Sequence, residues 1–340
     1  MKRTPVTIRD VAKAAGVSVT TVSHALNGKG EVRPSTAERI RAEAQRLGYQ
    51  PSRSARALRG GGTGFIALVL PRSVSPHVEA AMLGLDYYMQ IAAAAASTAF
   101  ERHCALVLPP PALTTADQWS ALAADGVLLC DPISDDPHID LLESIHTPVV
   151  TIERDLGRPD RRWYAAGDNN ANTEKVLDHL AARGARRIAL LIIDQHRWAW
   201  TTDITDTYRR WCTSHDQPSL VTEVPAVISE RYAYQNAIDL LAGPDRPDAI
   251  YAPSQGYSTG VLWACRELGL SVPDDVMVIG GNDSPSERES TPTVSAVDLH
   301  PEQQAIAATT MLLDLIAGTE PNGPVLIEST LHIRESTSRT

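Results

Sequence analysis

The chain has 340 residues, of which 43% are hydrophobic, so it can bury a large core divided over two or three domains. Its four cysteines are far apart, with no CxxC pair and no clustered histidines, which excludes a disulfide framework and leaves a zinc site unsupported. No uninterrupted apolar stretch approaches the ~18 residues that a membrane span requires, and the N-terminus has no apolar signal core. We therefore expect a cytoplasmic protein that binds no metal and no other cofactor.

The net charge of −10 averages two unlike parts of the chain. Residues 1–62 contain 12 Lys or Arg and four Asp or Glu, a balance of +8, whereas the remainder holds 19 basic and 37 acidic residues, a balance of −18. Short basic segments are often only solvated surface. A basic segment joined to an acidic body, however, confines attraction for phosphate to one small module and keeps DNA off the rest of the chain.

Near the N-terminus, residues 6–15 predict a short helix. Thr7 precedes the helical run and Asp10 follows three residues later, which is the spacing of a capping box. Apolar residues then recur at helical spacing and form a narrow stripe: Ile8, Val11, Ala12 and Ala15.

A second helix is expected after a break at Gly16-Val17, with Ser18 as its cap and Asn27 near its end. Val22 and Leu26 would pack this helix against the first one. The side chains left outside are short or compact: Val19, Thr20, Thr21, Ser23 and His24. A helix-turn-helix needs this arrangement to reach base edges in the major groove. The alternative is a helical hairpin inside an ordinary core.

A third helix is expected over residues 34–47, with Pro34 near its start and Gly48 at its end. Residues 51–62 follow as a linker that contains a short potential helix over 53–59 and ends in three glycines. So short a helix is not stable by itself in water, and we expect it to fold when it docks onto DNA and a partner chain.

The segments TIRDVAKAAGVSVTTVSHALNG, VRPSTAERI, LGYQPS and ARALR closely resemble the DNA-binding headpiece and hinge of the lactose-repressor (LacI/GalR) family of bacterial transcription regulators. The resemblance runs over about sixty residues without a gap. It implies a helix-turn-helix headpiece over residues 4–50 and a hinge helix and linker over 51–62. It also implies a homodimer that places two second helices in successive major grooves of a palindromic double-stranded DNA operator.

The resemblance assigns the DNA contacts to three groups of residues. Base reading falls to Val19, Thr20 and His24, which suit a thymine methyl group, a donor or acceptor, and a purine edge. Minor-groove contact falls to Leu58 as a wedge between base pairs, with Ala55 and Ala57 allowing close approach; alternatively, Leu58 only anchors the linker onto the body. The positions expected to hold phosphates are Thr7, Ser18, Thr21, Ser23, Asn27 and Tyr49.

From Gly64 onward the sequence alternates between strands and helices, which predicts an α/β fold of doubly wound parallel sheets. The first set has strands at 65–70, 105–108, 126–130 and 148–153, with helices at about 78–102, 117–123 and 138–144. The second set has helices at 173–183, 203–214, 230–241 and 258–268, with strands at 187–193, 249–252 and 276–279.

The family resemblance extends to periplasmic sugar-binding proteins and implies a body of two lobes. The N-terminal lobe would comprise residues 63–165 with about 293–323, and the C-terminal lobe residues 166–292 with about 324–336. In this arrangement residues 293–299 cross back to the first lobe with the helix at 301–317, and residues 325–333 return to the second.

A small-molecule effector is expected in the cleft between the lobes, at the carboxyl ends of the parallel strands. Arg154 either lines this pocket or bridges the lobes, and the tryptophans either stack on a ligand or pack against protein. The candidate effector-binding residues are His77, Arg154, Trp198, Trp200, Gln255, Asn282 and Asp283.

The cleft departs from the family pattern at two charged positions. Ile204 begins the segment where relatives carry an effector-gripping arginine, and Asn282 stands where a carboxylate usually holds ligand hydroxyls. Losing both groups removes the bidentate partners suited to sugars and other polyols. The effector is then an atypical small molecule, or the cleft binds none.

Two other classes of protein were weighed. An enzyme is disfavoured because the chain has no P-loop, no GxSxG elbow, no HExxH and no well-placed GxGxxG, so we assign no catalytic residue. A transport-type binding protein would share the two-lobed body but would need a signal peptide and would have no use for residues 4–60. We therefore predict a sequence-specific DNA-binding transcription regulator, acting as a homodimeric repressor.

The hinge gives a first testable prediction. Leu58→Ala should weaken operator binding by about tenfold or more while leaving nonspecific DNA binding nearly unchanged, because only the operator complex contains the wedge. Fluorescence anisotropy on operator and on scrambled duplexes measures both affinities. Equal losses on the two duplexes would defeat the wedge model.

Overall fold

A computed structural model describes residues 6–27, 32–49, 62–71, 85–110, 113–194, 197–225 and 229–338. The chain divides into two compact units, residues 1–64 and 65–340, and each is described by itself. Several predicted contact residues lie outside the described residues, so their roles stay predictions: Ala55, Ala57, Leu58 and His77. The side chain of Asn27 lies outside them as well.

The first unit is a three-helix headpiece, as the sequence predicted. Its helices are α1 (Ile8–Ala15), α2 (Val19–Asn27) and α3 (Pro34–Leu47). Their small shared core centres on side chains that are fully buried, among them Val11, Val22 and Ile40. Because most of the other buried residues in this core are alanines, the three helices can approach one another closely.

The turns of the headpiece follow from local chemistry. The Asp10 carboxylate accepts hydrogen bonds from the backbone N–H of Thr7 at 2.8 Å and from its hydroxyl at 2.7 Å, which fixes the start of α1. Gly16 ends that helix in the left-handed conformation with φ +63°, where a side chain would be strained. The Thr21 N–H then donates to Ser18 Oγ at 3.1 Å, so Ser18 caps α2 as predicted.

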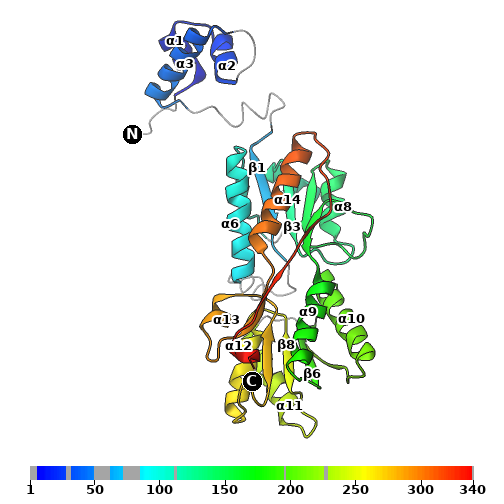
Figure 1. The fold of residues 1–340 in the computed structure, drawn as a ribbon. Coiled ribbons are helices and arrows are strands. Elements are labelled where there is room, and N and C mark those ends of the chain that lie inside the picture. The colour runs from blue at the N-terminus through cyan, green and yellow to red at the C-terminus, as the bar shows by residue number, and fades with distance from the viewer. Residues whose placement is uncertain are drawn as a thin grey trace. The chain divides into compact units, whose positions relative to one another are not determined.

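The body contains two six-stranded sheets, each covered on both faces by helices (Figure 1). The first sheet is entirely parallel, in the order β11-β5-β4-β3-β1-β2. Its strands are β1 (Phe65–Val69), β2 (Ala105–Val107), β3 (Gly126–Cys130), β4 (Val149–Ile152), β5 (Tyr164–Gly167) and β11 (Val325–Ile327).

Successive side chains of a strand point to opposite faces of the sheet, and each face packs against its own pair of helices. Ile66 and Leu68 belong to the same buried cluster as residues of α6 (Asp86–Glu101) and α14 (Pro301–Ile316). Ala67 and Val69, on the opposite face, cluster with residues of α7 (Ala116–Leu122) and α8 (Pro137–Ser144). Strands buried on both faces read as continuous apolar runs, which is why the sequence identified them.

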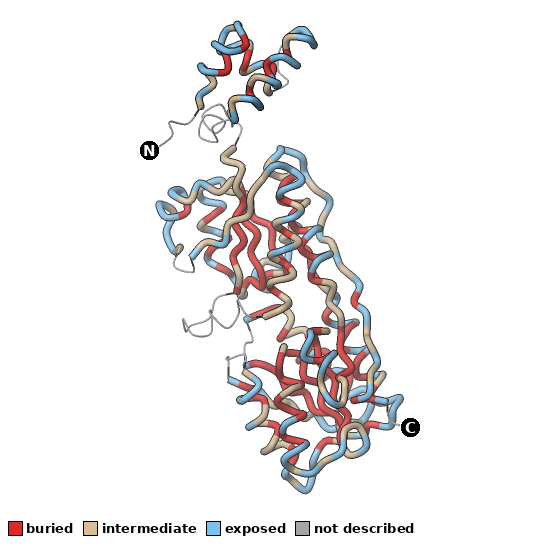
Figure 2. The backbone as a smooth tube through the Cα atoms, turned by 90° about the vertical axis from the view of Figure 1, so that its left-hand side faces the viewer, coloured by how far each residue is buried: buried red, intermediate tan, exposed pale blue. Residues whose placement is uncertain are grey.

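The second sheet has the order β12-β10-β9-β8-β6-β7 and is parallel except for β12, which runs antiparallel to β10. Its strands are β6 (Ile188–Ile193), β7 (Leu220–Val224), β8 (Ala249–Ala252), β9 (Met277–Gly280), β10 (Ser295–Asp298) and β12 (Thr330–His332). One face packs on α9 (Asn169–Ala182) and α10 (Ala199–Ser214), and the other on α11 (Glu230–Ala242) and α12 (Tyr257–Glu267). Figure 2 shows the buried residues concentrated along the strands of both lobes.

The chain passes between the lobes three times: from β5 to α9, from β10 to α14, and from β11 to β12. Two strand placements predicted from the sequence are therefore wrong. Strand β10 stays in the second sheet beside β9, because only the short helix α13 (Pro285–Glu289) separates the two strands. Strand β11 belongs to the first sheet beside β5, because the preceding α14 packs on that sheet.

Strands β5 and β7 and helix α13 were not predicted from the sequence, because all three are short. The start of α6 was predicted too early, since Leu85 is extended and the helix starts at Asp86; residues 78–84 of the expected helix lie outside the described residues. The helices that the structure describes are all too short or too polar to cross a bilayer.

The close packing of α11 on α12 gives a stability prediction. A Cβ at Gly260 would lie 2.6 Å from the Tyr234 backbone N, so Gly260→Ala should lower the free energy of unfolding by about 1–3 kcal/mol. The matched control is Gly243→Ala, where a Cβ meets nothing within 4 Å, and a change of about 0.5 kcal/mol or less is expected. Chemical unfolding followed by circular dichroism measures both, and equal effects would contradict the packing argument.

Candidate DNA-reading helix and interlobe cavity

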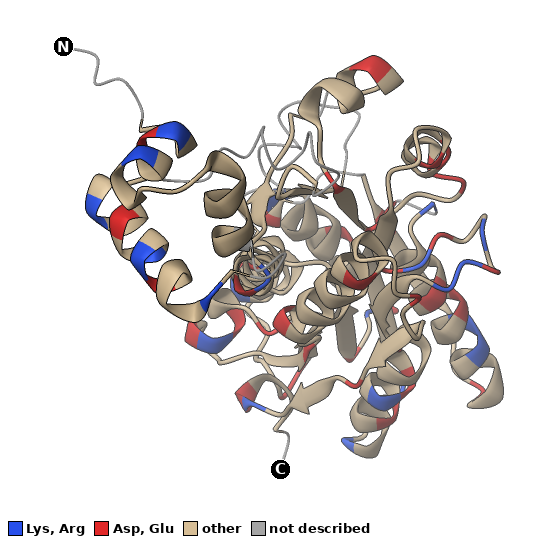
Figure 3. Ribbon diagram, turned by 90° about the horizontal axis from the view of Figure 1, so that it is seen from above, with Lys and Arg blue, Asp and Glu red and all other residues tan. Residues whose placement is uncertain are grey.

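Helix α2 presents the three side chains predicted to read bases. Val19 is 41% exposed, and Thr20 and His24 are exposed as well, whereas Val22 and Ala25 on the other face are buried. The helix itself carries no lysine or arginine, while α1 and α3 beside it do (Figure 3). The arrangement suits a neutral helix that meets base edges while cations on neighbouring helices meet phosphates.

The predicted phosphate-contacting residues occupy varied environments. Thr7 is exposed, and Thr21, Ser23 and Tyr49 are half-buried. Ser18 and Thr21 also join their hydroxyls at 2.8 Å across the first turn of α2. The hydroxyl groups of Ser18 and Thr21 therefore cap the start of α2. A phosphate contact by these residues would be made from the first turn of that helix.

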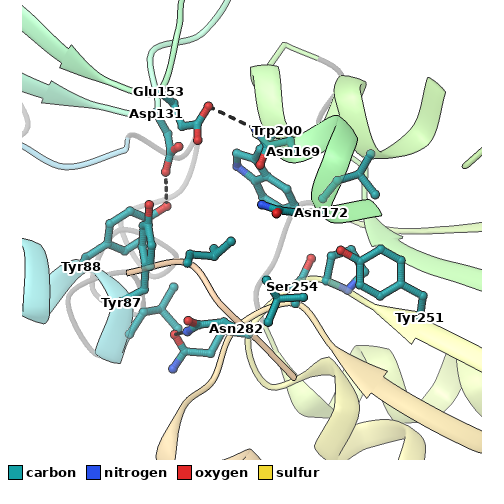
Figure 4. Close-up of a pocket in the computed structure, with 17 residues that line it drawn as sticks. Tyr87, Tyr88, Asp131, Glu153, Asn169, Asn172, Trp200, Tyr251, Ser254 and Asn282 are labelled. Atoms are coloured by element: carbon teal, nitrogen blue, oxygen red, sulfur yellow. Dashed lines mark hydrogen bonds between the residues drawn. The ribbon is translucent and has the colours of Figure 1, made fainter. Parts of the chain in front are cut away.

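The body holds a cavity of about 90 Å³ where the carboxyl ends of the two sheets face each other (Figure 4). Its walls come from α6, α9, α10 and the segments that follow β3, β4, β8 and β9. The lining residues are Leu85, Tyr87, Tyr88, Asp131, Glu153, Asn169, Asn172, Trp200, Ile204, Tyr251, Pro253, Ser254, Gln255, Gly281, Asn282, Val297 and Leu299.

Two carboxylic acids stand together in the first-lobe wall of the cavity. Asp131 and Glu153 directly follow the neighbouring strands β3 and β4, so the sheet register brings them to the same edge. They are only 7% and 5% exposed. Both adopt the left-handed backbone conformation, with φ of 43° and 73°, which is costly for residues other than glycine and is a common feature of functional sites.

Burial governs the protonation of this pair. Burial first, and then the charges of Asp131 and Asp203, raise the pKa of Glu153 from 4.5 to about 8. Burial also raises the pKa of Asp131 from 3.8 to about 6, although the hydrogen bond from Tyr88 opposes the rise. The Tyr88 hydroxyl donates to Asp131 at 2.6 Å, and Asn169 Nδ2 donates to Glu153 at 3.3 Å.

The second-lobe side of the cavity is neutral. Asn282 Nδ2 donates to Gln255 Oε1 at 3.1 Å. Two further polar atoms, Ser254 Oγ and Asn172 Nδ2, are buried without a hydrogen-bond partner among the described residues. The floor is tight, because a Cβ at Gly281 would lie 2.8 Å from the Pro253 carbonyl carbon.

Comparisons with known proteins identify the family. Residues 7–52 match the model of bacterial regulatory proteins of the lacI family, and residues 177–337 match a periplasmic binding protein-like domain. The chain is 28% identical to the HTH-type transcriptional regulator CelR of Thermobifida fusca over 342 residues, covering 97% of this chain and 98% of that protein.

The chain belongs to the lacI family of bacterial regulatory proteins.

Two solved structures agree with this LacI-family assignment. The fold matches that of the Lac repressor dimer bound to operator and the anti-inducer ONPF, with a TM-score of 0.82 at 23% identity, over 98% of this chain and 99% of that one. It also matches a complex of the transcriptional regulator CelR with cellobiose, with a TM-score of 0.71 at 26% identity, over 97% and 99% of the two chains. The chain is thus a DNA-binding transcription regulator, and its relatives are regulators rather than enzymes.

Of the residues that the sequence predicted for the effector site of this LacI-family chain, Trp200, Gln255 and Asn282 line the cavity. Arg154 does not: it forms an ion pair with Asp203 of α10, which bridges the lobes. Asp283 is also absent from the lining, because its carboxylate is drawn to the Arg334 guanidinium at 2.7 Å. Neither residue lines the described cavity, and Arg154 makes the bridging contact that was the alternative; a role of either residue in effector binding stays a prediction.

The two tryptophans have separate positions. Trp198 is 3% exposed at the start of α10 and is not part of the lining, contrary to expectation. Its ring stacks on Trp200 with centroids 6.0 Å apart and planes at 22°. Trp198 thus supports Trp200, whose ring forms the cavity wall.

Sequence reasoning missed the residues that give the cavity its chemistry. Neither Asp131 nor Glu153 was among the site residues predicted from the sequence. A signal was available, since both acids directly follow apolar runs at adjacent strand ends. No comparable signal pointed to Tyr87, Tyr88 or Asn172, because these residues lie within helices and reach the cavity only through tertiary packing.

The raised pKa of Glu153 predicts how stability changes with pH. The folded protein holds a proton that the unfolded chain releases above pH 4.5, so stability is full below that pH and is lost as the pH rises through about 8. Glu153→Gln should remove this decline, and at pH 9 it should raise the melting temperature by about 4 °C or more relative to the parent chain.

Differential scanning calorimetry from pH 5 to pH 9 measures this effect. Asp117→Asn, at an exposed acid in the first turn of α7, is the matched control and should keep the parent slope. If Glu153→Gln follows the parent curve at every pH, Glu153 is not protonated in the folded chain at neutral pH.

Proposed function

We propose that this LacI-family chain is a transcriptional repressor that binds a palindromic operator as a homodimer. The observation that supports this proposal most is the exposure pattern of α2. Val19, Thr20 and His24 are exposed, while the opposite face is buried in the headpiece core. Two such helices related by a two-fold axis fit successive major grooves, and the operator then shares that symmetry.

In the proposed complex, each exposed side chain reads a different base feature. Val19 suits the thymine methyl group, Thr20 can donate or accept a hydrogen bond, and His24 reaches a purine edge. The polar residues at the starts of α1 and α2 would fix the register on phosphates, and the hinge would enter the minor groove through Leu58. Such a complex forms where the operator is, in the cytoplasm of a bacterium.

We further propose that the interlobe cavity is the effector site and that occupation changes the angle between the lobes. The three chain crossings allow such a rotation, and contacts across the cleft would change with it. They include the Arg154–Asp203 ion pair and the hydrogen bond from Ser134 N to Arg197 O at 2.8 Å. A ligand that favours one angle alters the spacing of the two hinges and thus operator affinity.

Selection of bound duplexes from a random DNA pool tests the DNA-binding proposal. The full chain should enrich a palindrome with half-sites one helical turn apart. Failure to enrich any sequence, both in buffer and with cell metabolites added, would overturn it.

The selected operator allows a sharper test on His24. We expect His24→Ala to weaken operator binding by about 1–3 kcal/mol, or about 5- to 150-fold, and to relax the base preference at one position of each half-site. Gln45→Ala, on the exposed surface of α3, is the control and should bind like the parent. Anisotropy on single-base operator variants measures this. An unchanged preference at every position would show that His24 does not read a base.

A further inference from the structure

The described lining of the cavity contains two acidic side chains and no basic one. Asp131 and Glu153 contribute two nearly buried carboxyl groups, and among the described residues none of those that line the cavity is a lysine, arginine or histidine. The nearest basic side chain in sequence, Arg154, is engaged with Asp203. A buried acid pair without a counter-charge is costly, and a bound cation would remove that cost.

The remaining lining residues suit an organic cation rather than a metal ion. Trp200, Tyr87 and Tyr88 supply aromatic faces, which attract ammonium groups in a desolvated site. Ser254 and Asn172 also line the cavity and are 95% and 94% buried, and Ser254 Oγ and Asn172 Nδ2 have no hydrogen-bond partner among the described residues, so this wall has unused hydrogen-bonding capacity. The described residues contain no cluster of three or more side chains suited to holding a metal.

We propose that the effector of this regulator is a small amine, whose ammonium group binds between Asp131 and Glu153 while its body lies against Trp200. The proposal rests on the proposed function only in taking the cavity as the effector site. The sequence did not indicate which class of small molecule binds, because Ile204 and Asn282 replace the family's arginine and carboxylate. The proposal names that class.

Other ligand classes fit less well. A phosphate or carboxylate would face two acids with no cation among the lining residues described, so an anion is repelled. A neutral polyol could hydrogen-bond to both carboxyl groups but would leave the charge of Asp131 uncompensated. An ammonium group supplies both the hydrogen-bond donors and the charge.

Binding of an amine should be coupled to proton release. Glu153 interacts with Asp131, with the Asp203–Arg154 pair and with the Tyr87 hydroxyl, and it holds its proton at neutral pH. When the ammonium enters, the Glu153 O–H proton leaves to solvent and an ammonium N–H donates to the resulting carboxylate. The affinity should therefore rise with pH, by up to tenfold per unit below the Glu153 pKa.

Matched pairs of probes test the ligand class on the full chain. Each pair differs in one kind of group, an amine in place of a hydroxyl: glucosamine and glucose, putrescine and 1,4-butanediol, tyramine and tyrosol. Each is added at about 10 mM with ionic strength held equal, and the melting temperature and calorimetric Kd are recorded at pH 8. At least one amine should bind, and at least about tenfold more tightly than its hydroxyl twin. The proposal is overturned if a hydroxyl twin binds as tightly as its amine, or if no amine binds.

The bound amine is then titrated from pH 6 to pH 8 against three variants. The parent Kd should fall about tenfold per pH unit, and Glu153→Gln should abolish this slope, since it has no proton to release. Asp131→Asn should weaken binding by about tenfold or more, and the exposed control Asp117→Asn should behave like the parent. A Kd independent of pH in the parent chain would exclude Glu153 as the ammonium partner.

Operator binding separates the two proposals. If no amine binds but the selected operator is bound, only the ligand class fails. If an amine binds and no DNA sequence is enriched, the repressor proposal fails and the amine site stands. When both bind, the amine should change operator affinity in the parent chain, and in Asp131→Asn the same change should need about tenfold more amine.

Discussion

Two separate parallel sheets must bury both of their faces under helices, and this constraint sets the geometry of the whole body. Parallel strands need long crossovers, so every segment that follows a strand emerges at the same edge of its sheet. Three chain crossings then hold the two carboxyl edges opposite each other. The cavity, its acid pair and the contacts across the cleft all follow from that opposition.

The sequence predicted the elements far better than their assembly. Continuous apolar runs such as 188–193 identified the central strands, and Thr7, Asp10 and Ser18 identified the helix starts, because each signal acts between near neighbours in the chain. The strands β10 and β11 were assigned to the wrong lobes, since which sheet accepts a four- or three-residue strand depends on where α13 and α14 pack. The local sequence pattern therefore does not indicate which sheet each of these strands joins.

The site shows the same division. Gln255 and Asn282 were predicted by their position relative to a family pattern and Trp200 as a nearby aromatic side chain, and all three line the cavity. Arg154 and Asp283 lie outside the lining because they pair with Asp203 and Arg334, partners far away in sequence that no local pattern indicates. The acid pair was missed although Asp131 and Glu153 follow adjacent strands, because no single-residue signal marks a carboxyl group that loses its solvent only on folding.

Gly281 has a consequence for how such a regulator changes specificity during evolution. Its backbone lies so close to Pro253 that no side chain fits there, so that part of the cavity is main chain and is insensitive to substitution elsewhere in the strand. New ligands must therefore be accommodated by exchanging the walls. Substitutions of a few residues after the strands and on α6 or α10 can change which ligand is bound. The main chain at Gly281 and the headpiece would stay the same.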